Sequence, residues 1–340
     1  MPHIFRQSYF RSGGNRIIRP QASAWSDRQL GYDPVTTDLV VGPPQTTNAA
    51  PGARIFRPVR TPGMTFKYLV YGKEHLRRYR TKRGPKGKIR TASFQASTET
   101  GALDRHTFAS DLDELEIESA QIAEPNYDAR LHANILSRMW VTLDVEADRA
   151  ELLQDPSNYT NVTTLTSGNE FNGASGDMQT TLRTAARTIL NAVPGATTED
   201  IVAFMPQSTE DAAVEDTVWK AARANGGNGF LPDAAEIARY LKFKRVETGN
   251  PVAQQDDGTV APLYPDMCLL YYESPSASFD TSRGSYLDFA IRGDRGQGGA
   301  RTPFYDDSSS TFFYPWEEFT GPAITRELNA HLVLNCNKDV

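Results

Sequence analysis

The positive and negative charges of this chain are separated along the sequence. Residues 1–90 hold 18 Lys and Arg against 4 Asp and Glu, a balance of +14, whereas residues 91–340 hold 18 against 38, a balance of −20. The net charge of −6 conceals this division. A separation of this size predicts a partner for the basic part: nucleic acid, the acidic body of another copy of the chain, or both.

Residues 1–62 are expected to form an extended arm. Prolines and glycines recur there, and the apolar residues show no sustained helical or strand period. A solvated disordered tail is the alternative interpretation. Ile17, Ile18 and Ile55 are more apolar than such a tail needs, which favours an arm that lies along a protein surface. Arginines recur along the whole arm: Arg6, Arg11, Arg16, Arg19, Arg28, Arg54, Arg57 and Arg60.

Residues 63–110 predict an extended β-hairpin loop. Residues 65–71 are rich in strand formers, and because an isolated two-stranded ribbon is marginal in water, the hairpin must lie on something else. Its tip carries eight cations and no acid: Arg77, Arg78, Arg80, Lys82, Arg83, Lys86, Lys88 and Arg90. Five acids then follow in a short run: Asp111, Asp113, Glu114, Glu116 and Glu118.

The basic tip allows two interpretations. Tyr71 and Tyr79 interleave with the cations, as in a surface that stacks on nucleic-acid bases. Alternatively, the tip rests on the acidic surface of a neighbouring subunit. The second interpretation is favoured because the chain supplies acidic surface in large excess. The tip and the acids of residues 111–118 are therefore expected to meet between subunits.

Residues 127–153 show the strongest helical pattern, with Asn126 as the expected N-cap and Asp155 followed by Pro156 as the stop. Such a helix would be about 40 Å long at 1.5 Å per residue. Its expected buried stripe has spacings of three and four residues: Leu131, Ile135, Met139, Leu143, Ala147, Ala150 and Leu153.

The second half of the chain predicts a compact α/β unit. One helix is expected to begin at Ser175, another to run from Ser208, with Asp211 as its capping partner, past Val218. Further elements are expected as a helix at 233–241, strands at 201–205, 244–247, 267–272 and 286–291, and a closing strand within 323–334.

The sequence shows no catalytic or metal-binding motif. Zinc-protease, nucleophile-elbow and phosphate-loop signatures are missing, and the five histidines are widely spaced. The glycine-rich run 293–299 precedes no helical pattern, which favours a surface loop over a phosphate site. Two cysteines are too few for a disulfide framework, and neither a secretory signal nor a membrane-spanning run is present. We therefore expect no catalytic residue, metal or cofactor, and folding in a reducing cytoplasm.

The order of these parts resembles the major capsid protein of tailed bacteriophages, the Hong Kong 97 phage type. Segments 67–73 and 84–87 resemble the extended loop of that family. Segment 146–153, followed by Asn158 and Tyr159, resembles the end of its spine helix. Further segments follow in the order that the family shows: 166–171, 230–232, 238–241 and 245–249.

The resemblance implies an α+β fold of the Hong Kong 97 phage type. In that fold, the extended loop lies over a neighbouring subunit. The implied divisions are an N-terminal arm at 1–62, an extended loop at 63–110, a peripheral domain at 111–169 with a spine helix at 127–153, an axial domain at 170–305, and a C-terminal return to the peripheral domain at 306–340.

The resemblance also implies a structural, non-enzymatic role. Pentamers and hexamers would close into the icosahedral shell of a virion, assembled in the host cytoplasm without a membrane. The shell would enclose double-stranded DNA without sequence specificity, faced by Arg6, Arg11, Arg16 and Arg19 of the arm. The chain has no long helical scaffold segment at its front, so a separate scaffolding protein is expected, together with portal and decoration proteins.

Two alternatives remain. The shell protein of a bacterial nanocompartment shares this fold but encloses cargo enzymes instead of DNA. A nucleic-acid-binding enzyme with a basic arm is the alternative from a different class, and it would lose a measurable activity on mutation of a single acidic residue.

Overall fold

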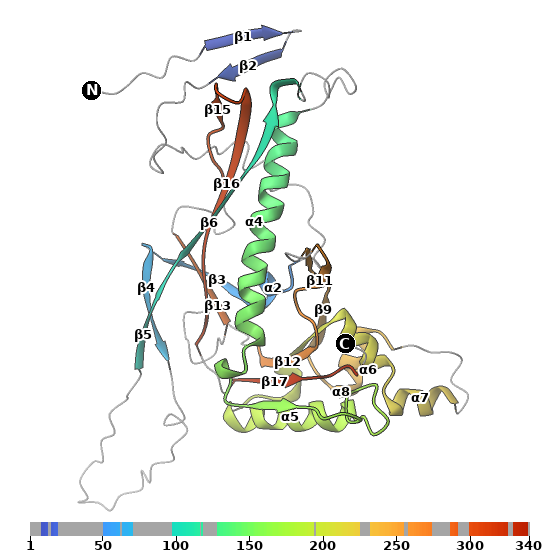
Figure 1. The fold of residues 1–340 in the computed structure, drawn as a ribbon. Coiled ribbons are helices and arrows are strands. Elements are labelled where there is room, and N and C mark those ends of the chain that lie inside the picture. The colour runs from blue at the N-terminus through green and yellow to red at the C-terminus, as the bar shows by residue number, and fades with distance from the viewer. Residues whose placement is uncertain are drawn as a thin grey trace, which may run out of the picture.

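The chain has two parts, an α/β unit at the foot of a long helix and an elongated sheet beside that helix (Figure 1). The hairpin tip and most of the arm lie outside the described residues. The computed structural model describes residues 8–12, 15–19, 50–61, 63–70, 97–115, 117, 128–193, 195–224, 232–254, 258–273, 286–291, 299–325 and 329–338.

The α/β unit is built on a five-stranded sheet with the order β7-β17-β12-β8-β9. The central strand β12 is antiparallel to both neighbours, whereas the outer pairs β7–β17 and β8–β9 are parallel. The strands span β7 (Val162–Thr164), β8 (Ile201–Pro206), β9 (Arg245–Gly249), β12 (Met267–Tyr272) and β17 (Ala330–Leu334).

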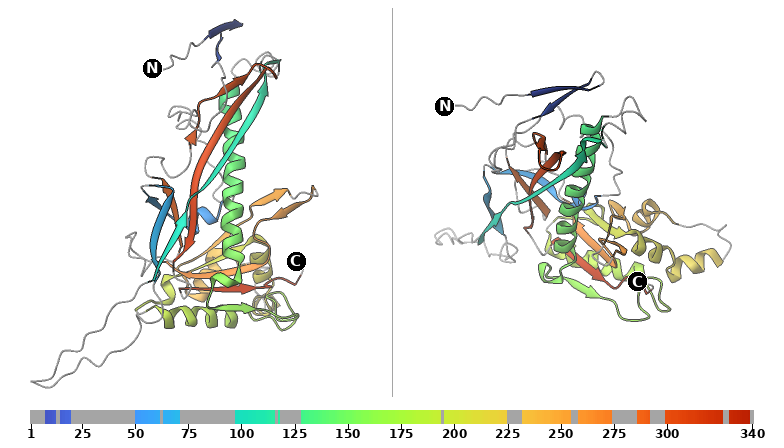
Figure 2. Two further views of the ribbon diagram at one scale, coloured as in Figure 1. Left: turned by 60° about the vertical axis from the view of Figure 1, so that its left-hand side comes forward. Right: turned by 45° about the horizontal axis from the view of Figure 1, so that its top comes forward.

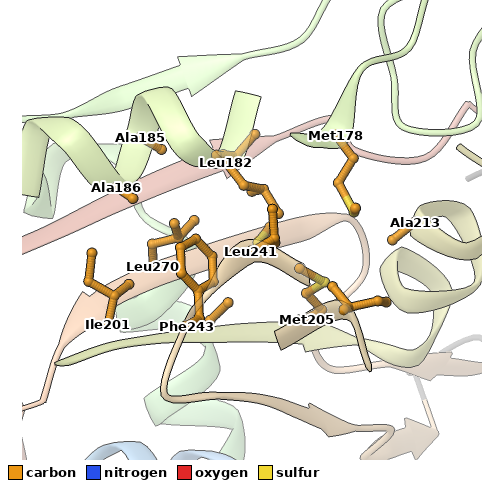
Figure 3. Close-up of a cluster of buried hydrophobic side chains, with 14 of the residues drawn as sticks. Met178, Leu182, Ala185, Ala186, Ile201, Met205, Ala213, Leu241, Phe243 and Leu270 are labelled. Carbon is orange, nitrogen blue, oxygen red and sulfur yellow. The ribbon is translucent and has the colours of Figure 1, made fainter. Parts of the chain in front are cut away.

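Helices cover one face of this sheet. Because side chains alternate along a strand, Ile201 and Met205 of β8 point to the same face. There they join Leu182, Leu241 and Leu270 in a fully buried cluster (Figure 3). The helices described in this unit are α5 (Met178–Ala192), α6 (Gln207–Val214), α7 (Thr217–Ala224) and α8 (Ala234–Leu241).

The opposite face of the sheet packs against the foot of the long helix. Val202 and Phe204 of β8 point to that side and pack with Leu153 of α4 (Ala129–Gln154). Ile55 and Phe56, at the end of the short helix α2 (Gly52–Ile55), complete this cluster. The central strands are therefore buried on both faces, which explains why β8 is apolar throughout instead of alternating.

The long helix α4 stands on the α/β unit and packs along an elongated sheet (Figures 1 and 2). Its 26 residues extend about 39 Å at 1.5 Å per residue. The longest strand pairing joins β6 to β16 over residues 104–113 and 311–320. This sheet contains β3 (Arg57–Thr61), β6 (Asp104–Asp113), β13 (Tyr286–Ile291), β14 (Gly299–Ala300), β15 (Phe304–Asp306) and β16 (Thr311–Ile324).

Three two-stranded ribbons complete the described strands. The pairing of β4 with β5 confirms the base of the predicted hairpin. The pairing of β1 with β2 forms a hairpin inside the arm that the sequence did not predict. The ribbons are β1 (Ser8–Ser12) with β2 (Asn15–Arg19), β4 (Thr65–Val70) with β5 (Ser97–Ala102), and β10 (Val252–Gln254) with β11 (Val260–Pro262). In the part of the chain that is described, no helix is long and apolar enough to cross a membrane.

The helix predicted at 127–153 is confirmed, but its cap and its buried face differ from the prediction. Asp128 is the N-cap, since its Oδ1 accepts from the Leu131 amide at 3.2 Å. Met139 of the predicted buried stripe is 49% exposed. Small polar residues lie on the face that is buried, among them Ser137, whose hydroxyl bonds both the Ser110 amide and the Tyr314 carbonyl at 2.7 Å.

The helix starts of the α/β unit also differ in detail. Asp177, not Ser175, caps α5, by accepting from the Thr180 amide at 2.8 Å. Ser208 caps no helix and donates to the Pro265 carbonyl at 2.6 Å. The single helix predicted from Ser208 past Val218 is divided into α6 and α7. The strands predicted at 201–205, 244–247, 267–272 and 286–291 and the helix at 233–241 are confirmed.

The division between α6 and α7 has a local cause. Asp216 is fully buried, and its carboxylate accepts from the amides of Met178 and Val218, both at 2.8 Å. It therefore satisfies backbone donors at the starts of α5 and α7 at once. A continuous helix would carry this carboxylate away from Met178.

Sheet membership crosses the expected domain boundaries. β13 and β14 lie within 170–305, yet they pair with β16 beside α4. β7 lies within 111–169 and β17 within 306–340, yet both belong to the five-stranded sheet. The expected closing strand within 323–334 is in fact the end of β16 and all of β17, in two different sheets.

Candidate functional site

A buried carboxylate joins the last turn of the arm to both parts of the subunit. Glu146 lies on α4 and is fully buried. Its Oε1 accepts from the backbone amide of Gly52 in α2 and from the Tyr264 hydroxyl, the latter at 2.9 Å. Arg149, on the same helix, pairs with its Oε2 at 3.4 Å. Three segments far apart in the sequence therefore meet on one side chain.

The pKa values of Glu146 and Tyr264 are shifted by burial and by the groups that surround them in this junction. Burial raises the pKa of Glu146, while the Gly52 amide and the charge of Arg149 act in the opposite direction. Burial and the adjacent carboxylate raise the pKa of Tyr264 well above its ordinary value, so its hydroxyl stays a donor. A Cβ at Gly52 would lie 2.9 Å from both Glu146 oxygens, so glycine is required for this approach.

Two arginines of the arm are bonded within the subunit. Arg54 donates to the Thr248 carbonyl at 2.7 Å, and Arg57 lies 3.8 Å from Glu273. Glu273 is also held by Arg245 at 2.6 Å and by Lys244. The hydrogen bonds from Arg245 lower the pKa of Glu273 to about 2, so it stays ionised. Arg54 and Arg57 thus fix the end of the arm to the α/β unit.

The described members of the acidic run, Asp111, Asp113 and Glu114, lie at the C-terminal end of β6 and directly after it. Asp111 is exposed opposite Phe313 of β16. Asp113 accepts from the Leu115 amide at 2.8 Å, and Glu114 accepts from the Tyr305 hydroxyl at 3.3 Å. The structure therefore keeps these three acids near the surface of one strand end.

The remaining predicted site residues belong to the arm, the hairpin tip and the end of the acidic run. Arg11, Arg16 and Arg19 lie in the β1–β2 hairpin, whose side chains are outside the described set. The following predicted residues lie wholly outside the described residues: Arg6, Arg77, Arg78, Arg80, Lys82, Arg83, Lys86, Lys88, Arg90, Glu116 and Glu118.

Contacts between charged or titratable side chains of β6, β16 and α4 are a feature that the sequence did not reveal. Glu317 of β16 is 3% exposed and is held by Arg105 and Arg301. His106 of β6 lies 2.8 Å from Asp144 and 3.4 Å from Asp148 of α4. The available signal was the pair Glu317 and Glu318 within residues 312–319, where five of the eight residues are aromatic. These contacts link β6 to β16 and to α4.

No model of a known protein family matches the chain, and no curated protein matches it. Solved structures do match. A phage-related protein from Bordetella bronchiseptica aligns with a TM-score of 0.67 and 16% identity, over 90% of this chain and 98% of that one. The capsid of cyanophage P-SCSP1u gives 0.55 and 10%, over 84% and 87% of the two chains.

A third solved structure, an encapsulin complex from Synechococcus elongatus, aligns with a TM-score of 0.52 and 10% identity, over 86% of this chain and 90% of that one. At these identities the likeness shows the fold. The fold expected from the sequence is confirmed.

Proposed function

We propose that this chain, which has the α+β Hong Kong 97 phage-type capsid fold, is the major capsid protein of a tailed bacteriophage. Subunits would form pentamers and hexamers that close into an icosahedral shell in the host cytoplasm. The observation that carries this proposal is the alignment with a phage-related protein and a phage capsid over most of each chain's length. Capsid subunits are structural, so no catalytic group is required.

The charge division supports an enclosed cargo of double-stranded DNA. Cations that contact phosphates bind without reading sequence, which suits a shell that must hold any genome. Arg6, Arg11, Arg16 and Arg19 are proposed to face that cargo. Arg54 and Arg57, which are bonded within the subunit, contribute less to it. Scaffolding, portal and decoration proteins are the other partners proposed.

In this proposal α4 and its elongated sheet form the peripheral domain. The five-stranded sheet with its helices forms the axial domain at the capsomer centre. The junction at Glu146 then joins the arm to both domains, so that a force on the arm is transmitted to the foot of α4. The basic tip rests on acids of a neighbouring subunit, and among the described members of the run Asp111 is the exposed one.

The experiment that tests this assembly reverses the charge of the tip. Arg78→Glu, Arg80→Glu and Arg83→Glu together should leave the subunit folded and prevent particle formation, measured by gradient sedimentation. Exposed ion pairs are worth only about 0–1 kcal/mol each, but every subunit of a shell repeats them. The matched control is Arg187→Glu, Lys220→Glu and Lys242→Glu, three exposed cations of the α/β unit. Equal assembly of both triple variants would contradict the contact between the basic tip and a neighbour's acids.

The encapsulin likeness favours a second candidate, the shell of a bacterial nanocompartment. The two differ in what the particle encloses. Particles purified from the native source should contain nuclease-protected DNA if the chain is a capsid protein. Cargo enzyme without protected DNA would favour the nanocompartment.

A further inference from the structure

A hollow opens at the seam where α4 packs on β6. Its volume is about 430 Å³, which falls within the range of small-molecule sites, roughly 300–1,000 Å³. Two residues of β6 and three of α4 line it: Thr107, Phe108, Trp140, Val141 and Asp144. The seam therefore has room for a small organic molecule, held between the helix and the strand.

Two aromatic rings supply most of the apolar lining. The rings of Phe108 and Trp140 meet at 68°, edge to face, with centroids 4.8 Å apart. Phe108 is 48% exposed and Trp140 is 40% exposed, so solvent and ligands can reach both rings. The face of an indole attracts cations, and ring edges and methyl groups such as those of Val141 attract apolar chains.

Carboxylates give the same seam a negative charge. Asp144 lines the hollow, and Asp148 follows one turn later on α4; their side chains are 68% and 45% exposed. Both contact the ring of His106, at 2.8 and 3.4 Å. Burial raises the pKa of Asp148, His106 lowers it, and the charges of Asp144, Asp104 and Glu151 raise it further. Among these five side chains only His106 can carry a positive charge, so the seam has an excess of negative charge.

This combination of groups suits a cation with an apolar stem better than a metal ion. In the described part of the chain, no group of three His, Cys, Asp or Glu side chains is placed to hold a metal ion. A metal ion would also gain nothing from the aromatic lining, because its ligands are oxygen, nitrogen and sulfur atoms. An alkylammonium ion uses both the rings and the carboxylates.

We propose that the hollow between α4 and β6 binds an aliphatic polyamine. One ammonium group is held by Asp144 and the face of Trp140, and the methylene chain lies against Phe108 and Val141. Ammonium groups form charge-assisted hydrogen bonds with carboxylates, and methylene stems cover apolar surface. Asp148 is available to a second ammonium group, since side chains four residues apart on a helix have Cβ atoms about 5–6 Å apart, a separation that a four-carbon chain spans.

A second hollow of similar size provides a matched comparison. It has a volume of about 410 Å³ and lies beside α6, lined by Gln207, Glu210, Asp211, Val214, Glu215 and Pro232. Three of these side chains are carboxylates and none is aromatic. If negative charge alone attracted polyamines, this hollow would bind them as well as the hollow at α4.

Calorimetric titration of unassembled subunits with 1,4-diaminobutane, at low ionic strength and neutral pH, tests the site. One saturable site per subunit is expected. Trp140→Leu should weaken binding about five- to tenfold, because the ring face is lost. Asp144→Asn should weaken it about tenfold or more, because a charged acceptor is lost. Should Trp140→Leu fail to fold, Phe108→Leu replaces it.

Two controls separate a specific site from a general attraction to acidic surface. Asp211→Asn removes a carboxylate from the second hollow and should leave the affinity unchanged. Mg²⁺ carries the same charge as the diamine but has no aliphatic stem, so an equal concentration should displace little of it. The lack of a saturable site, equal displacement by Mg²⁺, or an equal loss of affinity in Asp211→Asn would overturn the proposal. Each of these results would leave the proposed function standing.

Discussion

The α/β unit and the region around α4 differ in how completely they bury their own surfaces. In the α/β unit both faces of β8 and β12 lie in apolar clusters, and Phe204 is fully buried. Around α4, the interior holds charged and polar side chains such as Glu317 and Ser137, while the aromatic rings of Phe108 and Trp140 remain exposed. The first part completes its core within one chain. The second is held by ion pairs, hydrogen bonds and smaller apolar clusters, and part of its apolar surface stays exposed.

The largest expected effect contrasts one phenylalanine from each part. Phe204→Ala leaves a cavity between the sheet and α4, where the ring meets Tyr264 at 5.0 Å, and should lower the free energy of unfolding by about 3–5 kcal/mol. Phe108→Ala removes a half-exposed ring and should cost less than about 1.5 kcal/mol. Urea unfolding of the unassembled subunits measures both, and equal losses would contradict the contrast.

The second-largest loss of stability is expected at the junction around Glu146. Glu146→Ala leaves Arg149 buried without its carboxylate and should destabilise the subunit by about 3 kcal/mol. It also frees α2, so trypsin should cut faster after Arg54. Glu146→Gln keeps an acceptor for the Gly52 amide and should show a smaller change in both measurements. Cleavage of Glu146→Ala at the wild-type rate would show that the junction does not hold the arm.

A smaller effect is expected from a buried histidine, which makes the stability of the α/β unit depend on pH. His331 lies between the hydroxyls of Thr163 and Thr188, each at 2.8 Å, and burial lowers its pKa to about 4. Protons therefore bind the unfolded state more tightly. The contribution of His331 to the free energy of unfolding is therefore complete above about pH 6.5. It is lost as the pH falls toward 4, which lowers that free energy by an amount on the order of 2 kcal/mol.

The comparison with His331→Gln isolates this contribution from that of the carboxylates. The difference in unfolding free energy between wild type and His331→Gln should shrink as the pH is lowered from 7 to 4. A difference that stays constant over this range would mean that His331 has an ordinary pKa in the folded subunit.

Most of the helices and strands of the α/β unit were predictable because their signals are local. Apolar runs such as that of β8 and caps such as Asp233, which accepts from the Glu236 amide, act within a few residues of themselves. The face of α4 was not predictable in this way. A pattern that counts only apolar residues assigned Met139 to the interior, whereas Ser137 is buried because Ser110 and Tyr314 bond its hydroxyl.

Long strands and buried ion pairs were missed for a related reason. β16 contains Pro315, Gly321 and two acids, which locally argue against a strand of 14 residues. Pairing with β6 and the arginine partners of Glu317 override that argument. The charges of the tip and of residues 111–118 were evident in the sequence. The Glu146 junction was not, since its partners lie 94 and 118 residues away along the chain.

Electron microscopy of the purified protein, alone and with a scaffolding partner, tests the central claim most directly. An α/β unit that completes its own core, joined to a region that leaves apolar and charged surface for neighbours, predicts closed shells of regular size. Isolated compact subunits under both conditions, with the arm and hairpin folded onto their own chain, would contradict it.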